Sequence, residues 1–171
     1  NIFLIGMMGS GKSSVGHSLS KHLTNTFYDL DKEVEKRFNL SIRDIFIEYG
    51  EDLFRKEENK LLKELEISSG LIVSTGGGIV LLEENRTILK KNKTYFLEAN
   101  IEDMYERAIK KENNRPLLKG MDITKFKELY MKRRDLYIES ATATINVGKK
   151  SIEDLTIEII NNEKNIIWSN A

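Results

Sequence analysis

The chain has 171 residues, in which 27 Lys and Arg balance 27 Asp and Glu. This length is typical of a single domain of about 150 residues, and 40% hydrophobic with 32% charged residues is the balance of a globular protein. The zero net charge gives no reason to expect binding to nucleic acid or to a membrane surface. Because the chain has no cysteine, disulfides, Cys–zinc sites and thiol catalysis are excluded.

The chain has no segment that would take it into or across a membrane. No apolar run reaches the roughly 18 residues of a membrane-spanning helix, and no signal peptide is visible. We therefore expect a cytoplasmic protein, and we expect it to be a monomer. Since the first strand begins at Ile2, a few native residues are expected to precede Asn1.

Apolar runs alternate with segments of helical period along the chain, which predicts an α/β domain over 1–171. Such alternation is typical of a five-stranded parallel sheet with helices on both faces, a three-layer arrangement. The helices within about 31–68 interrupt the alternation and predict an inserted helical cap. Strands are expected at 2–5, 26–30, 71–74, 94–97 and 143–147, and helices at 11–22, 31–38, 41–49, 51–68, 81–91, 102–109, 124–140 and 152–161.

The segment 6–13 fits the phosphate-binding pattern G-x-x-x-x-G-K-[ST], between a predicted strand and a predicted helix. Its glycines let several backbone N–H groups converge on phosphate oxygens at the positive end of the helix dipole. Lys12 is placed to reach the β- and γ-phosphates, and Ser13 to bind Mg²⁺. The sequence therefore predicts ATP contacts at Gly9, Ser10, Gly11, Lys12, Ser13 and Ser14.

A phosphate loop does not specify the reaction. The base-reading motif N-K-x-D of regulatory GTPases is absent, because Asn59-Lys60 and Asn92-Lys93 lack the Asp. A small-molecule or nucleoside kinase remains, and a nucleotide-gated binding module without turnover is the rival from another class.

Two carboxylates follow the second predicted strand. Alternation along an extended segment puts Asp29 and Asp31 on the same side. Asp29 could hold Mg²⁺ through water, and Asp31 could accept a hydrogen bond from a substrate hydroxyl and act as its base. Asp31 could instead be the N-cap of the following helix.

Two predicted helices carry charged residues on their apolar faces. Glu58 lies in a stripe of apolar residues, with Arg55 three residues before it, so the pair is either buried together or a solvated ion pair. Arg133 shares the apolar face of the 124–140 helix, whereas Arg134 is rotated about 100° from it and is expected to be solvated. A cation on a buried face needs an anion, so Arg133 is a candidate clamp for a carboxylate.

Two glycine- or proline-containing segments complete the pattern. Gly76, Gly77 and Gly78 follow a buried strand, which favours close approach of a ligand over a merely flexible turn, because ligands of open α/β sheets bind at the carboxyl ends of strands. The polar segment 109–123 contains the sole proline, Pro116, and is predicted to be a mobile lid rather than an ordinary surface turn.

The ordered set of motifs resembles shikimate kinases over essentially the whole chain. It comprises the phosphate loop, Asp-Leu-Asp, Phe-Arg in the cap, Gly-Gly-Gly, Arg-Pro-Leu-Leu and Lys-Arg-x-x-Leu-Tyr. The resemblance implies a P-loop kinase fold and transfer of the ATP γ-phosphate to the shikimate 3-hydroxyl, in aromatic amino acid biosynthesis. Gluconate and nucleoside monophosphate kinases are the alternatives, but gluconate kinases share only the phosphate loop.

The resemblance also implies individual roles. Asp31 would bind ring hydroxyls and accept the proton, Arg55 and Arg133 would hold the substrate carboxylate, and Glu58 would orient the arginines. The remaining roles fall to residues around the pocket: Phe46 and Phe54 as its walls, Gly76, Gly77 and Gly78 as backbone contacts, Ser13 as an Mg²⁺ ligand with Asp29 and Ser74 acting through its waters, Arg115 of the lid as a phosphate contact, and Arg107 and Ile152 as the adenine contacts.

Overall fold

The computed structural model describes residues 1–110 and 120–169 of the chain. All five strands lie in one parallel sheet with the order β2-β3-β1-β4-β5. The central strand β1 is apolar throughout and buried, as expected for a strand covered on both faces. The strands are β1 (Ile2–Ile5), β2 (Thr26–Asp29), β3 (Leu71–Ser74), β4 (Lys93–Glu98) and β5 (Ala143–Asn146).

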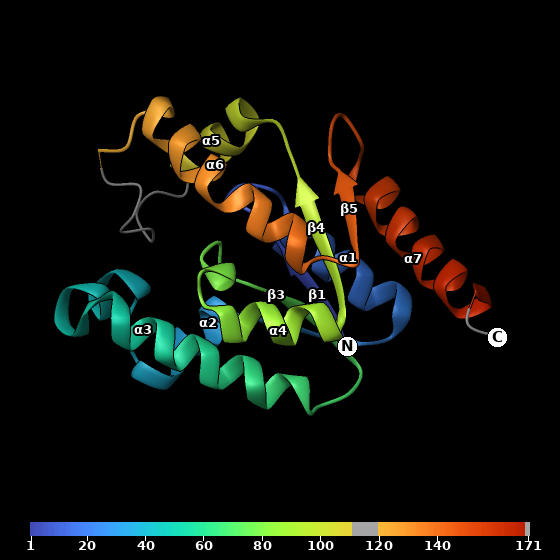
Figure 1. Ribbon diagram of the computed structural model, residues 1–171, viewed down its shortest axis with the longest axis horizontal. Coiled ribbons are helices and arrows are strands. Elements are labelled where there is room, and N and C mark those ends of the chain that lie inside the picture. The colour runs from blue at the N-terminus through green and yellow to red at the C-terminus, as the bar shows by residue number, and fades with distance from the viewer. Residues whose placement is uncertain (111–119, 170–171) are drawn as a thin grey trace.

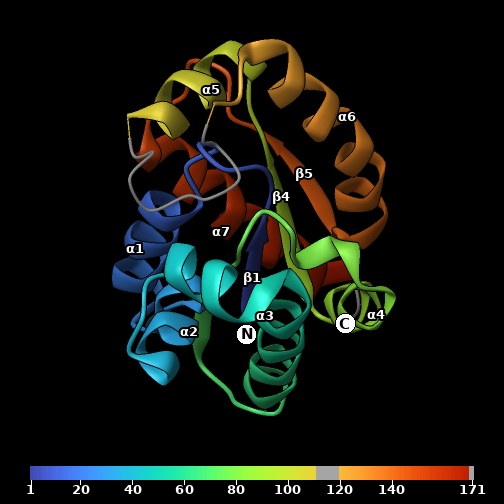
Figure 2. The ribbon, with the colours of Figure 1, turned by 90° about the vertical axis from the view of Figure 1, so that its left-hand side faces the viewer.

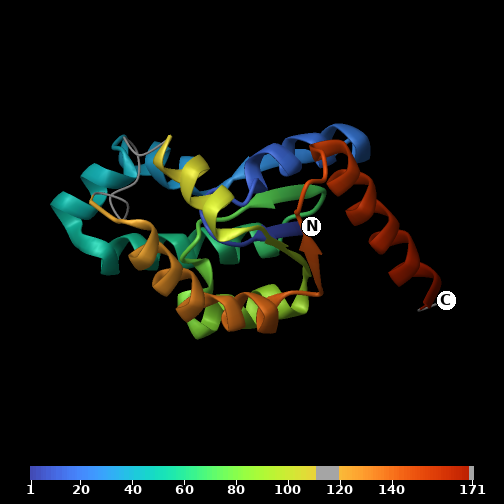
Figure 3. The same cartoon turned by 90° about the horizontal axis from the view of Figure 1, so that it is seen from above.

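Helices cover both faces of the sheet, which confirms the predicted three-layer architecture. Figure 3 shows α1 and α7 on one side of the sheet and α4 and α6 on the other. The helices are α1 (Lys12–Leu23), α2 (Leu30–Phe38), α3 (Ile42–Glu66), α4 (Glu83–Lys91), α5 (Ile101–Ile109), α6 (Ile123–Ser140) and α7 (Ile152–Ser169), with a short 3₁₀ helix η1 (Ile79–Leu81).

The predicted helical insertion consists of α2 and α3, which pack against each other at one end of the molecule (Figure 1). Gly50 interrupts α3 with φ 81° and ψ 169°, a conformation outside the helical region. The two helices expected on either side of this glycine are therefore present, joined without a loop. Figure 2 shows α2 and α3 facing α5 and α6 across the end of the sheet.

One local expectation about the second strand is wrong. The strand β2 ends at Asp29, and α2 begins at Leu30, so Asp31 lies in the first helical turn rather than in an extended segment. Asp29 is the N-cap, because its Oδ1 accepts a hydrogen bond of 3.3 Å from the Lys32 backbone N–H. Helical geometry at Leu30 therefore sets the directions of the two carboxylates, instead of strand alternation.

Other boundaries agree within a few residues, with one larger difference: α7 continues to Ser169, beyond the expected end at Asn161. Most of the predicted lid, residues 111–119, lies outside the described residues. Within the described ranges, every helix is too short or too polar to cross a bilayer.

Phe126 anchors α6 in the apolar core. Its side chain is fully buried and meets the ring of Tyr105 on α5 edge-on, with 5.5 Å between the ring centroids. Phe126→Ala is expected to lower the free energy of unfolding by about 3–5 kcal/mol, through lost burial and the cavity left behind. Denaturant unfolding measures this difference, and Lys127→Ala, at the exposed neighbouring position, is the control, with an expected change within about 0.5 kcal/mol. A loss below about 1 kcal/mol for Phe126→Ala would contradict this account of the core.

Candidate active site

The candidate residues meet at the carboxyl edge of the sheet because of the strand register. Ser74, the last residue of β3, pairs with Leu4 of β1 on one side and with Asp29 of β2 on the other. The segments that leave β1, β2 and β3 therefore begin beside one another. Thr75 strengthens this edge, since both its backbone N–H and its hydroxyl donate to the Leu4 carbonyl.

The phosphate loop connects β1 to α1 and is packed closely against α5. Gly9 has φ 82°, and a Cβ at this position would lie 2.2 Å from the Met104 carbonyl oxygen, so only glycine fits here. The Lys12 ammonium is buried and donates to the carbonyls of Gly6 (2.9 Å) and Met7 (3.0 Å). This places the cation against the loop that is predicted to hold the phosphates.

Other predicted nucleotide contacts lie on or near this loop. Ser10 is buried, and its hydroxyl has no hydrogen-bond partner, whereas Ser13 and Ser14 are exposed at the start of α1. Arg107 of α5 donates to the Gly9 carbonyl at 3.2 Å, which brings a second cation to the loop. Ile152 is the exposed first residue of α7, and among the described residues no hydrogen bond joins it to the phosphate loop. Arg115 lies outside the described residues.

Three oxygen-bearing side chains gather beside the loop. The Ser13 hydroxyl donates to Asp29 Oδ2 at 3.1 Å and lies 3.3 Å from Ser74 Oγ. One carboxylate and two hydroxyls are hard oxygen donors, which suit Mg²⁺, an ion that keeps most of its waters in proteins. The three residues predicted to serve a magnesium ion are thus brought together, and their chemistry fits that ion.

A buried ion pair lies next to this edge, on α3. Glu58 is fully buried and Arg55 is 8% exposed, and Arg55 Nη1 donates to Glu58 Oε2 at 2.8 Å. The alternative of a solvated pair is therefore wrong. Burial raises the pKa of Glu58 to about 7, although the positive charges of Arg55 and Arg133 oppose that rise and Asp31 adds to it. The other oxygen of Glu58, Oε1, has no hydrogen-bond partner in residues 1–110 and 120–169.

The Gly76–Gly78 turn passes directly through this charged cluster. A Cβ on Gly76 would lie 2.6 Å from Asp31 Oδ1 and 2.8 Å from Glu58 Oε1. A Cβ on Gly78 would lie 2.3 Å from Arg55 Nη2. The absence of side chains on the turn therefore lets Asp31, Glu58 and Arg55 converge on one stretch of backbone.

Arg133 reaches the same turn from the opposite side, on α6. It is 4% exposed, its Nη1 donates to the Gly77 carbonyl at 3.3 Å, and its Nε has no hydrogen-bond partner among the residues that the structure describes. The prediction that Arg133 points with the apolar face is confirmed. Arg134 was expected to be solvated, but its Nε donates to Glu98 on β4 at 2.7 Å while the side chain stays partly exposed.

Aromatic rings adjoin the charged cluster. Phe54 is buried and Phe46 is half-buried, with 5.0 Å between their ring centroids. The Arg55 guanidinium carbon lies 5.1 Å from the centroid of the Phe54 ring, within range of a cation–π contact. Phe54 therefore lies against Arg55, and Phe46 packs on Phe54; their role as walls of a pocket stays a prediction.

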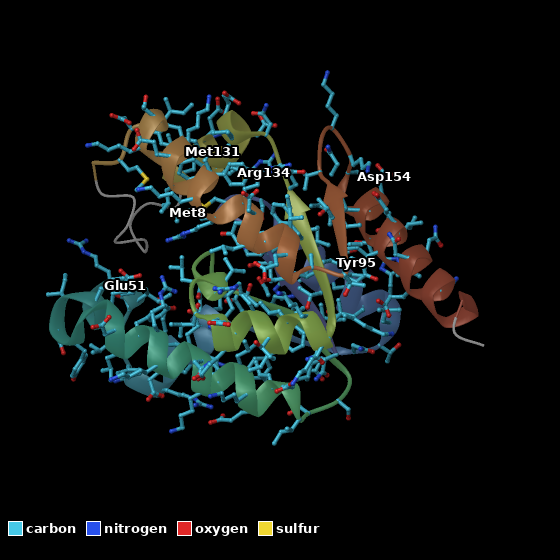
Figure 4. All side chains as sticks on the ribbon, in the orientation of Figure 1. Met8, Glu51, Tyr95, Met131, Arg134 and Asp154 are labelled. Carbon is cyan, nitrogen blue, oxygen red and sulfur yellow. The ribbon has the colours of Figure 1, made fainter. Side chains whose placement is uncertain are left out.

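Two interactions of this site were not predicted from the sequence. Glu51 accepts hydrogen bonds from Arg55 Nε (3.2 Å) and Nη2 (3.0 Å), and Figure 4 shows it on α3, on the side that faces α6. Its position four residues before Arg55 is a helical pairing signal that was available in the sequence. Tyr137 donates to the Gly77 carbonyl, a contact between segments 60 residues apart that only the fold reveals.

Comparisons with known proteins agree on one family. The family model described as "Shikimate kinase" matches residues 8–164. The shikimate kinase of Nitrosospira multiformis is 44% identical over 153 residues, which cover 88% of this chain and 78% of that protein. The shikimate kinase of Dictyoglomus turgidum is 41% identical over 165 residues, which cover 94% of this chain and 95% of that protein.

Solved structures agree with the sequence relatives. The shikimate kinase from Acinetobacter baumannii in complex with shikimate has a TM-score of 0.90 and 35% identity, covering 99% of this chain and 93% of that chain. The shikimate kinase from Aquifex aeolicus has a TM-score of 0.84 and 39% identity, covering 97% of each chain. The chain therefore belongs to the shikimate kinase family.

Proposed function

We propose that the chain transfers the γ-phosphate of ATP to the 3-hydroxyl of shikimate, giving shikimate 3-phosphate and ADP. One observation carries this proposal. Two buried arginines, the buried Glu58 and the Asp31 carboxylate all lie beside the Gly76–Gly78 turn, and that turn packs against the phosphate loop. A small acid with ring hydroxyls matches that combination, because one end needs cations and the other needs a hydrogen-bond acceptor. Gluconate and nucleoside monophosphates are the less favoured alternatives, since the matched family model and the relatives described above are shikimate kinases.

The two buried arginines hold the substrate carboxylate in this proposal. Arg55 donates hydrogen bonds to both Glu58 and Glu51, and these two bonds orient its guanidinium before substrate binds. Among the described residues, Arg133 donates to the Gly77 carbonyl over a long 3.3 Å and its buried Nε has no partner, so it has donor capacity to offer a ligand. Planar guanidinium groups recognise carboxylates through paired hydrogen bonds, which fixes the orientation of the ring as well as its affinity.

Asp31 acts as the base that accepts the proton of the 3-hydroxyl. Its Oδ1 and Glu58 Oε1 both lie beside Gly76. As the hydroxyl oxygen bonds to the γ-phosphorus, the bond from phosphorus to the terminal ADP oxygen breaks. Phosphoryl transfer needs chiefly alignment and charge neutralisation, so a correctly placed hydroxyl and a proton acceptor suffice at this end.

The nucleotide occupies the phosphate loop, with Lys12 neutralising the β- and γ-phosphates. Ser13 would ligate Mg²⁺, while Asp29 and Ser74 would hold its waters; when bound, the ion neutralises charge on the phosphate oxygens. The adenine lies between Arg107 and Ile152, and Arg115 reaches the phosphates from a lid at about 109–123. The enzyme works as a cytoplasmic monomer, without nucleic-acid or membrane partners.

The direct test is ADP release in a coupled assay with ATP, magnesium and one of three acceptors. Shikimate is expected to give turnover on the order of 1–100 per second, the range of kinases, and gluconate and AMP at least a hundredfold less. Equal turnover with gluconate or AMP would assign the site to one of the alternative kinases. A protein that binds ATP but releases no ADP with any acceptor would be a nucleotide-gated binding module.

Asp31→Asn tests the base. The amide keeps the size of the side chain but cannot accept the proton, so kcat is expected to fall at least about a hundredfold. The Michaelis constant for ATP is expected to stay within about twofold, since ATP is held elsewhere. Asp52→Asn, at an exposed position of α3, is the control and leaves both constants unchanged. A kcat within tenfold of the wild type would remove Asp31 from the role of base.

Glu58 gives a pH signature of stability. Its pKa in the folded protein is about 7, above the ordinary value of 4.5, so the unfolded chain releases this proton first as the pH rises. Below about pH 4.5 the carboxyl is protonated in both states and does not lower the free energy of unfolding. As the pH rises from about 4.5 to 7, the free energy of unfolding falls by up to roughly 3 kcal/mol.

Glu58→Gln removes this titration and provides the comparison. The free energy of unfolding of the wild type, minus that of Glu58→Gln, is expected to decrease as the pH rises from 4 to 8, with most of the change between 4.5 and 7. Denaturant titrations of both proteins across this range measure the difference. A difference that is constant with pH, or that increases, would contradict the raised pKa.

A further inference from the structure

Tyr137 occupies a position that no role above requires. It lies on α6, one helical turn after Arg133, and is fully buried. Its ring stacks on Phe96 of β4, with 5.1 Å between centroids and 21° between the ring planes. Its hydroxyl donates to the Gly77 carbonyl, in the centre of the three-glycine turn.

The Gly77 carbonyl thus receives two donors from α6, the Tyr137 hydroxyl and Arg133 Nη1. A carbonyl oxygen has two lone pairs and can accept both. The bond from Arg133, at 3.3 Å, exceeds the usual range for N–H···O bonds and is the weaker of the two. Burial raises the pKa of Tyr137, so its hydroxyl stays protonated and remains a donor at every working pH.

The same hydroxyl lies next to the phosphate loop. It is 4.0 Å from Met7 Sδ, and a Cβ on Gly77 would lie 3.4 Å from the Met8 backbone nitrogen. The turn that faces the proposed substrate is therefore packed directly against the loop that faces the nucleotide, and Tyr137 contacts both. Figure 4 shows Met8 in the space between α6 and the η1 turn, where these segments meet.

We propose that Tyr137 is a positioning residue that holds the Gly77 carbonyl so that Arg133 is free to bind the substrate carboxylate. This rests on the proposed function, in which Arg133 is one of the two carboxylate ligands. With the hydroxyl present, Arg133 can leave Gly77 without stranding a buried carbonyl. Without it, Arg133 is the sole donor to that carbonyl among the described residues. A substrate carboxylate that draws Arg133 away from Gly77 then leaves a buried carbonyl without a hydrogen bond, which weakens binding.

Tyr137→Phe tests this directly, because it removes the hydroxyl and keeps the ring stacked on Phe96. The Michaelis constant for shikimate is expected to rise about five- to tenfold, the scale of one net hydrogen bond. The constant for ATP and kcat are expected to stay within about twofold, since the phosphate loop and Asp31 are untouched. Tyr130→Phe is the matched control. It removes a tyrosine hydroxyl from the same helix, but that hydroxyl donates to Glu98 and not to Gly77, so the Michaelis constant for shikimate is expected to stay unchanged.

A double variant separates this role from a merely structural one. In an Arg133→Ala background there is no arginine left to be drawn onto Gly77, so adding Tyr137→Phe is expected to change the shikimate constant less than about twofold. A Michaelis constant is a concentration and does not depend on the folded fraction of the enzyme. Partial unfolding of a variant would therefore lower kcat and leave this readout intact.

The outcomes distinguish the inference from the function on which it rests. A wild type that releases no ADP with shikimate contradicts the proposed function. A wild type with turnover, together with a shikimate constant for Tyr137→Phe within twofold of it, contradicts the role of Tyr137 alone. An equal rise for Tyr130→Phe, or an equal rise in the Arg133→Ala background, also contradicts it, because the effect would then come from a loosened α6.

Discussion

The site depends on keeping two guanidinium groups, those of Arg55 and Arg133, buried in the protein. A buried cation is costly unless an anion or several hydrogen-bond acceptors surround it. Arg55 meets this constraint through Glu58 and Glu51, and Arg133 meets part of it through the Gly77 carbonyl. Glu58 bears the consequence of the arrangement, since its burial raises its pKa to about 7. A raised pKa means that ionising Glu58, the partner of Arg55, costs free energy in the folded state.

The fold satisfies the constraint by bringing three separate helices to one strip of backbone, the Gly76–Gly78 turn. Arg55 and Glu58 come from α3, Arg133 from α6, and Asp31 from the first turn of α2. Only a backbone without side chains can pass between them, because a Cβ at Gly76 or Gly78 would collide with their charged atoms. The pairing of Ser74 with Leu4 and Asp29 then aligns this strip with the phosphate loop and the oxygen cluster. Register in the sheet therefore determines how the two halves of the site meet.

Much of this was predictable from local patterns, and the failures have physical causes. The phosphate loop, the five strands and the buried faces of Glu58 and Arg133 follow from motifs and periodicity, which depend on neighbours in sequence. The predicted direction of the Asp31 side chain was wrong because Asp29 is an N-cap, and the helix begins one residue earlier than expected. The pairing of Arg134 with Glu98 and of Tyr137 with Gly77 joins segments 36 and 60 residues apart, and no local pattern predicts such contacts. The adenine contacts at Arg107 and Ile152 remain predictions. The lid also remains a prediction, because Arg115 lies outside the described residues.

The unpaired atoms of the site suggest how it selects an anion. Within the described part of the chain, Arg133 Nε and Glu58 Oε1 are both buried without hydrogen-bond partners, which is rare in proteins and costs free energy. A carboxylate that reaches Arg133 removes the unpaired donor, whereas a neutral analogue of the same shape leaves it unpaired in a now drier site. The difference in binding free energy between the carboxylate and the neutral analogue therefore has two parts. One is the attraction of the carboxylate to Arg133, and the other is the cost of leaving a buried charged donor unpaired. Because the chain is neutral overall, this discrimination comes from the geometry of a few buried groups and not from its net charge.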